Sequence, residues 1–144
     1  MYHRLHRAPN VLLVEDNPAD AMLMETALGE VNQCSLHLAS DGEEAIQYLL
    51  NKDAGFRGRP DLILLDLNLP RVHGHEVLRI IKSDDDLKTI PVVILTSSRA
   101  QSDITGAYRS GANSYLEKPA DLEATYDLAR TIHHYWLDLS LLPA

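Results

Sequence analysis

The sequence is short of cysteine and of long apolar runs. Cys34 is the single cysteine among 144 residues, so no internal disulfide can form, and a small buried thiol in a reducing compartment is expected. The longest apolar runs span about five residues, against roughly 20 for a membrane-spanning helix. The basic residues of the segment 1–7 are not followed by the apolar run of a signal peptide. These absences predict a cytoplasmic protein with no membrane segment.

Positive charge is also scarce. The chain has 13 Lys and Arg against 21 Asp and Glu, for a formal net charge of −8. Nucleic-acid-binding proteins need clustered basic residues to displace counterions from phosphates, so this class is excluded. A cationic partner or a bound metal cation fits the charge better. A chain of 144 residues can bury one core but not two, so we expect a single domain.

Short apolar segments alternate with helical patterns along the whole chain. The predicted strands are Val11–Val14, Ser35–Ala39, Leu62–Leu65, Val92–Leu95 and Ser114–Leu116. The predicted helices begin at Asn17-Pro18, cover Ala45–Leu50, Val77–Ile81 and Ser102–Ser110, and run from Asp121 to Asp138. Strict alternation predicts an α/β fold, a mostly parallel sheet with helices on both faces, in the flavodoxin-like order 2-1-3-4-5. We expect a tail over 1–9, a domain over 10–138 and an apolar tail over 139–144.

Polar residues follow four of the predicted strands. Glu15 and Asp16 follow the first strand, Asp66 the third, Thr96 ends the fourth, and Lys118 follows the fifth. Taken singly, each of these residues has a purely structural explanation. Acidic residues often cap helices, threonines occupy turns and lysines face solvent. Parallel strands end at one edge of their sheet, however, and ligands bind there. We therefore expect these five side chains to meet.

Such a group has a defined chemistry. Three carboxylates repel one another unless a cation lies among them, and oxygen ligands suit Mg²⁺. The ammonium of Lys118 and the hydroxyl of Thr96 can stabilise the oxygens of a transferring phosphoryl group. A carboxylate can itself be the nucleophile and form an aspartyl-phosphate. The pattern predicts Mg²⁺-assisted phosphoryl transfer onto Asp66.

Four motifs resemble the receiver domains of two-component response regulators. They are Val14-Glu15-Asp16-Asn17, Leu65-Asp66-Leu67-Asn68-Leu69-Pro70 with Gly74, Leu95-Thr96-Ser97-Ser98, and Gly111-Ala112 with Tyr115 to Lys118-Pro119. The resemblance spans roughly Asn10 to Leu137. It implies a phosphoacceptor switch rather than a classical enzyme, with a sensor histidine kinase as partner. His73 departs from the family, which usually has Asp or Asn there, but this loop position does not put the chemistry in doubt.

The resemblance implies a role for each site residue. Asp66 would be the phosphoacceptor, and Thr96 and Lys118 would hold the phosphoryl oxygens. The implied Mg²⁺ ligands are Glu15 (through water), Asp16, Asp66 and the backbone carbonyl of Asn68. Thr96 and Tyr115 would move together on phosphorylation. The Lys118–Pro119 peptide bond would be cis, a form that is common only before proline.

The C-terminal segment is similar to that of the small single-domain regulators that partner bacterial and cyanobacterial phytochromes. Tyr135-Trp136-Leu137 followed by Leu141-Leu142-Pro143-Ala144 carries this likeness, together with Ile90–Ser98. One helical stripe, including Leu122 and Trp136, is expected to cover the sheet. A second apolar surface favours a homodimer, with interface residues Leu128, Tyr135, Trp136, Leu139, Leu141 and Leu142. The alternative is that the tail folds back onto its own domain.

Other functions fit less well. A flavin carrier of this fold needs a phosphate-binding loop after the first strand, where Glu15 and Asp16 would repel a phosphate. A phosphatase with an aspartyl nucleophile usually has a second Asp two residues on, but position 68 is Asn. The main alternative is an interaction module that keeps the fold and signals without phosphorylation. The intact set of Glu15, Asp16, Asp66, Thr96 and Lys118 argues against it.

Overall fold

The computed structural model describes residues 8–31, 34–50 and 59–143. Its strands are β1 (Asn10–Val14), β2 (Ser35–Ala39), β3 (Leu62–Leu65), β4 (Val92–Thr96) and β5 (Ser114–Glu117). All strand pairs are parallel, and the order is β2-β1-β3-β4-β5, which confirms the predicted flavodoxin-like topology. Most of the predicted tail over 1–9, and Ala144, lie outside the described residues.

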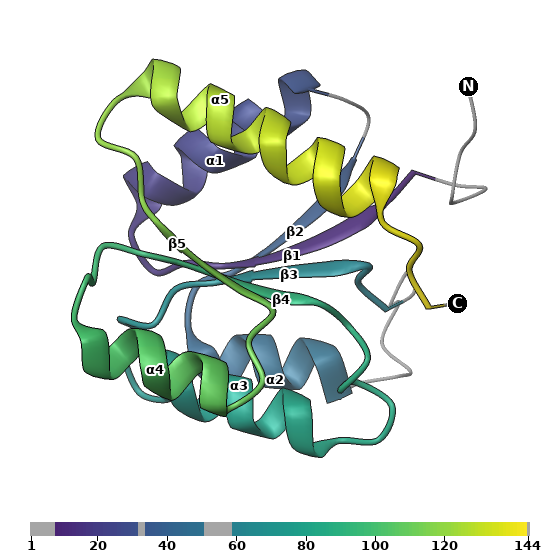
Figure 1. Ribbon diagram of the computed structural model, residues 1–144, viewed down its shortest axis with the longest axis vertical. Helices are drawn as coiled ribbons and strands as arrows, with labels where there is room; N and C mark the ends of the chain where they lie inside the picture. The colour runs from purple at the N-terminus through teal and green to yellow at the C-terminus, as the bar shows by residue number, and fades with distance from the viewer. Residues whose placement is uncertain (1–7, 32–33, 51–58, 144) are drawn as a thin grey trace.

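Helices cover both faces of the sheet. They are α1 (Pro18–Val31), α2 (Gly42–Leu50), α3 (Gly74–Ser83), α4 (Gln101–Arg109) and α5 (Leu122–Ile132), the last continued by the π-helix η1 (His133–Leu139). Figure 1 shows α1 and α5 on one face and α2, α3 and α4 on the other. Within the described ranges, no helix has the length and apolar character needed to cross a membrane.

Alternation along the strands divides the interior into two cores. Leu12 and Val14 of β1 face α2, α3 and α4, whereas Val11 and Leu13 face α1 and α5. Strands β3 and β4 are buried throughout, as expected for strands covered on both faces. The edge strand β2 is only partly buried, and Cys34 beside it is half-buried. The central strands are therefore rigid supports for whatever follows their carboxyl ends.

The start of α1 follows directly from the sequence. The side chain of Asn17 accepts hydrogen bonds from the backbone N–H groups of Ala19 (2.9 Å) and Asp20 (3.1 Å), and Pro18 is the first helical residue. This cap fixes the first turn of α1 immediately after Glu15 and Asp16. It places Asp20 at the carboxyl edge of the sheet.

The end of the last helix differs from the prediction. A regular helix would place Leu122 and Trp136 on the sheet, but Leu122 is 54% exposed and Trp136 is only partly buried. Leu137 is buried instead, five residues after the buried Ile132. The π-helix explains the change from Trp136 to Leu137, because its hydrogen bonds join residues five apart and shift the buried stripe by one position; it begins well after Leu122 and does not account for the exposure of that residue.

Candidate functional site

Three carboxylates meet where β1 and β3 end. Val14 pairs with Leu65 across the two strands, and the next residues carry the acidic side chains. Glu15, Asp16 and Asp66 each present an oxygen, and these oxygens all lie within 4.8 Å of one another. Glu15 and Asp66 are buried, whereas Asp16 is exposed. The predicted carboxylate group is therefore present, with one side open to water.

Lys118 reaches this group from the end of β5. Its backbone N–H donates to the carbonyl of Thr96 (2.9 Å), which places the lysine beside β4. Its ammonium lies 2.8 Å from Glu15 Oε1, 2.9 Å from Asp66 Oδ2 and 2.9 Å from Asp20 Oδ2. Sequence reasoning missed Asp20. The available signal was its spacing, because a residue one helical turn after Asp16 returns to the same edge.

The two buried partners have shifted pKa values. Burial raises the pKa of Glu15 to about 7, and the charge of Asp66 adds to the rise, although the Lys118 and Asn17 hydrogen bonds oppose it. Burial lowers the pKa of Lys118, but the hydrogen bonds to Glu15, Asp20 and Asp66 outweigh this and raise it overall. Lys118 therefore stays charged. Its single ammonium faces Glu15, Asp20 and Asp66, and Asp16 lies beside them, so the group is short of positive charge.

This donor set fits a divalent cation. Hard cations bind carboxylate oxygens, and the oxygens of Glu15, Asp16 and Asp66 are close enough to share one ion. The exposure of Asp16 leaves space for water, which such ions retain. The described residues thus contain, at the predicted place, a group of carboxylates that can hold a cation.

The loop after Asp66 is tightly packed against the start of α3. Asn68 donates its backbone N–H to Asp66 Oδ1 (3.1 Å), and Gly74 donates its N–H to the carbonyl of Leu67 (3.1 Å). A Cβ atom on Gly74 would lie 2.4 Å from the Asp66 carbonyl oxygen and 2.4 Å from Leu67 Cα. Glycine at position 74 is therefore required for the loop that holds Asp66 in place.

Thr96 lies at the end of β4 and is completely buried. Its Oγ1 has no hydrogen-bond partner among the described residues. A buried hydroxyl without a partner is unusual and needs an explanation. An oxygen arriving at the site would provide the partner, which agrees with the role that the sequence predicts for Thr96.

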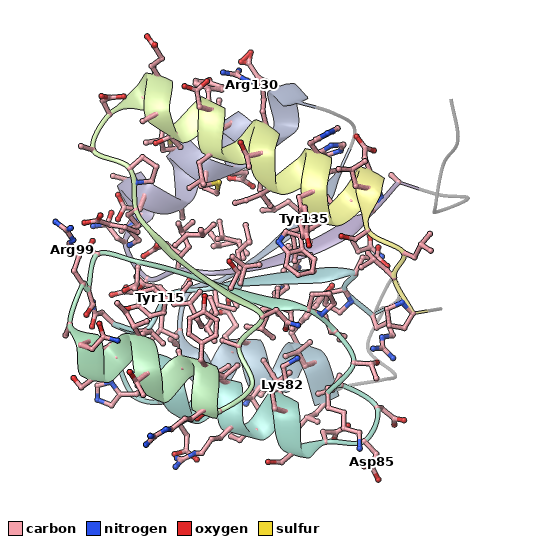
Figure 2. All side chains as sticks on the ribbon, viewed as in Figure 1. Lys82, Asp85, Arg99, Tyr115, Arg130 and Tyr135 are labelled. Carbon is pink, nitrogen blue, oxygen red and sulfur yellow. The ribbon has the colours of Figure 1, made fainter. Side chains whose placement is uncertain are left out.

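A second polar network begins two residues beyond Thr96. Tyr115 donates its hydroxyl to the carbonyl of Ser98 (3.0 Å), and the Ser98 hydroxyl donates to Asp103 Oδ2 (2.5 Å). Asp103 Oδ1 lies 3.2 Å from Nε2 of His75 on α3. The bonds from Ser98 and then His75 lower the pKa of Asp103, and burial raises the pKa of Tyr115. Figure 2 shows Tyr115 between β5 and α4. The network links α3, α4 and β5, and its His75–Asp103 part was not predicted.

One expectation about this region is wrong. The Lys118–Pro119 peptide bond is trans, since no described residue has a cis peptide bond. The trans form is the intrinsically favoured one even before proline. In this form Lys118 already reaches Glu15, Asp20 and Asp66, so the site geometry does not depend on the cis form.

Fold and site together define a class. Residues 11–130 match the response regulator receiver domain family, and the chain belongs to this family. Receiver domains are phosphoacceptor switches of two-component systems rather than classical enzymes.

Particular relatives cover nearly the whole chain. The probable methanogenesis regulatory protein FilR2 of Methanothrix harundinacea is 43% identical, over 92% of this chain and 86% of its own length. The response regulator Rcp1 of Synechocystis is 40% identical, over 93% of this chain and 92% of its own length. The structure of the phosphorylated cyanobacterial phytochrome response regulator RcpA superposes with a TM-score of 0.88 at 40% identity, covering 96% of this chain and all of RcpA. The structure of the Mn²⁺-bound form of Rcp1 superposes with a TM-score of 0.85 at 39% identity. The match covers 94% of this chain and 99% of the Rcp1 chain.

Proposed function

We propose that this chain is a response regulator that receives a phosphoryl group on Asp66 from a sensor histidine kinase, with Mg²⁺ as its cofactor. One observation carries the proposal: the buried carboxylate of Asp66 is hydrogen-bonded to Lys118 within a group of carboxylates that can share a cation. An interaction module that signals without phosphorylation would have no use for this arrangement. Family membership supports the same function.

The transfer is a displacement at phosphorus. An Asp66 oxygen forms the new bond to phosphorus while the bond to the kinase histidine nitrogen breaks, and that nitrogen leaves with the electron pair and takes up a proton. Lys118 and Thr96 donate to the phosphoryl oxygens. Glu15, Asp16, Asp66 and the carbonyl of Asn68 would hold the ion. Mg²⁺ bound there supplies positive charge to the phosphoryl oxygens during transfer.

The proposed kinase is a phytochrome acting in the cytoplasm. RcpA is a cyanobacterial phytochrome response regulator, and its 40% identity over nearly the whole chain supports this kinase class. FilR2 is at least as similar and is described as a methanogenesis regulator. The test compares the rate of phosphotransfer to this chain from a purified phytochrome kinase with the rate from a kinase that has no chromophore domain. The phytochrome kinase is expected to be the faster donor. Faster transfer from the second kinase would contradict it.

Intact mass tests the phosphoacceptor directly. After incubation with acetyl phosphate and Mg²⁺, the wild-type protein is expected to gain one phosphoryl group, and Asp66→Asn to gain none, because the amide is not a nucleophile. A chelator should also prevent the gain. Asp127→Asn removes an exposed carboxylate from α5 and is the matched control, expected to gain the group normally. An unchanged adduct in Asp66→Asn would exclude Asp66 as the acceptor.

The proposal also includes a homodimer formed through the C-terminal segment. The boundaries of the tail (1–9), the domain (10–138) and the apolar tail (139–144) stay predictions. Of the predicted interface residues, Tyr135, Leu139 and Leu141 are exposed, at 54%, 54% and 77%. Leu128, Trp136 and Leu142 are partly buried against their own core. Part of the tail therefore folds back onto its domain, and the exposed part is the surface offered to a second copy. Tyr135 is labelled in Figure 2.

Sedimentation velocity tests the dimer. The double variant Leu139→Ser/Leu141→Ser is expected to raise the dimer dissociation constant by about tenfold or more, because each change acts twice in a two-fold interface. Met22→Ser changes a residue on α1 that is 68% exposed, and should leave association unchanged. A wild-type protein that is monomeric at all concentrations, with or without phosphorylation, would exclude the dimer.

A further inference from the structure

The ammonium of Lys118 has no free N–H. A lysine ammonium has three donors, and here they face Glu15, Asp20 and Asp66 at 2.8 to 2.9 Å. In the proposed function, the same ammonium must donate to an oxygen of the incoming phosphoryl group. One of the three carboxylates must therefore release Lys118 when that oxygen arrives.

The three carboxylates differ in what release would cost. The side chains of Glu15 and Asp66 are only 4% exposed, so water cannot readily replace a hydrogen bond from Lys118 at either of them. The side chain of Asp20 is 42% exposed, and water can replace the lost hydrogen bond. Asp20 is thus the partner that is most readily released.

Asp20 is also separate from the proposed cation ligands. In the part of the chain that the structure describes, the carboxylates close enough to share an ion are Glu15, Asp16 and Asp66. The backbone of Asp20 is fixed by the Asn17 cap, so release requires only a side-chain rotation. Asp20 and Lys118 both line a small pocket of about 30 Å³ between α1 and α5, which is large enough to admit water beside the two side chains.

We propose that Asp20 is a positioning residue, a displaceable partner that holds Lys118 in the unphosphorylated protein and competes with the phosphoryl group for it. This inference rests on the proposed function. Asp20 contributes in two ways. It orients the ammonium toward Asp66, and its negative charge opposes the arrival of an anion near Lys118. Removing the charge should therefore tighten the binding of a phosphoryl group, whereas loss of a purely structural contact would weaken it.

Beryllofluoride, which mimics a phosphoryl group on a carboxylate, provides the test. Its dissociation constant is measured by ¹⁹F NMR at Mg²⁺ concentrations shown separately to saturate each variant. Asp20→Asn is nearly isosteric and is expected to bind about two- to fivefold more tightly than wild type, the range expected for a partly exposed ion pair. Asp20→Ala should show the same direction, and Asp20→Glu should return the constant to near the wild-type value.

Glu25→Gln is the matched control, because it removes one negative charge from an exposed position on the same helix. Tighter binding in Asp20→Asn than in Glu25→Gln supports the inference. Equal or weaker binding in Asp20→Asn, with wild type binding normally, overturns the inference and leaves the proposed function intact. Failure of the wild-type protein to bind beryllofluoride would overturn both.

Discussion

Replacing Gly74 by alanine is expected to destabilise the protein by about 3 kcal/mol and to slow phosphorylation of Asp66 severalfold. The added Cβ would lie 2.4 Å from the Asp66 carbonyl oxygen and 2.4 Å from Leu67 Cα, and both contacts are with backbone. Backbone cannot rotate away as a side chain can, so either α3 or the loop carrying Asp66 must move. Urea unfolding measures the stability loss, and the rate of adduct formation from acetyl phosphate measures the displacement of Asp66.

Gly29→Ala is the matched control for this substitution. Gly29 lies in α1, and a Cβ there would meet nothing within 4 Å. Alanine is a better helix former than glycine by about 0.5–1 kcal/mol, so this variant should be slightly more stable than wild type. A loss of stability in Gly74→Ala together with a gain in Gly29→Ala would show that the Gly74 effect comes from close packing. Wild-type stability and phosphorylation in Gly74→Ala would contradict the loop geometry.

Lys118→Met is expected to cost on the order of 2–4 kcal/mol of folding free energy at pH 8 in the absence of metal. The substitution keeps an unbranched side chain but leaves the buried carboxylates of Glu15 and Asp66 without their ammonium. Mg²⁺ should restore more stability to this variant than to wild type, because it binds only the folded state and supplies the missing charge. Urea unfolding with and without Mg²⁺ measures both effects.

The deficit of Lys118→Met should shrink as the pH falls. The pKa of Glu15 in the folded protein is about 7, above its ordinary 4.5, so the folded state takes up this proton before the unfolded chain does. Stability from this group is therefore gained as the pH falls from 7 toward 4.5 and lost as it rises. Losing the Lys118 bond, which lowers the pKa of Glu15, moves that gain to higher pH in the variant.

Lys88→Met is the control for the loss of a lysine. Lys88 pairs with Asp85 at 3.2 Å on the surface, where both side chains are more than half exposed. Such pairs contribute little, so this variant should lose less than about 0.5 kcal/mol at every pH. An equal loss in the two lysine variants would mean that the carboxylates around Lys118 are better solvated than their burial indicates.

The fold and the centre of the site could be predicted because they depend on simple geometry. Parallel strands end at one edge, so Glu15, Asp66 and Lys118 had to approach one another. The alternation of apolar strands with helices also indicated a parallel sheet, for which the order 2-1-3-4-5 was the simplest choice. Site contacts that depend on side-chain reach were harder to predict. Asp20 was missed because it belongs to a helix rather than a strand end, although its spacing from Asp16 held the signal.

Two other features could not be predicted from a pattern of regular helices and strands. His75 reaches Asp103 across α3 and α4, a contact set by how closely the two helices pack. The π-helix shifted the buried stripe from Trp136 to Leu137, and no sequence period of 3.6 residues can show such a local widening. The trans form of the Lys118–Pro119 bond corrects an expectation that came from the resemblance alone.

The Thr96 hydroxyl, which has no hydrogen-bond partner in the part of the chain that the structure describes, has a thermodynamic consequence. A buried hydroxyl without a hydrogen bond costs the resting fold about 1–3 kcal/mol. In the proposed function a phosphoryl oxygen accepts from Thr96 and removes this cost, so this contact would contribute to the driving force for the change of state. On this view, phosphorylation relieves a defect at the end of β4 rather than imposing a strain on it. The cost of the buried hydroxyl thus lowers the free energy needed to pass from the unphosphorylated conformation to the phosphorylated one.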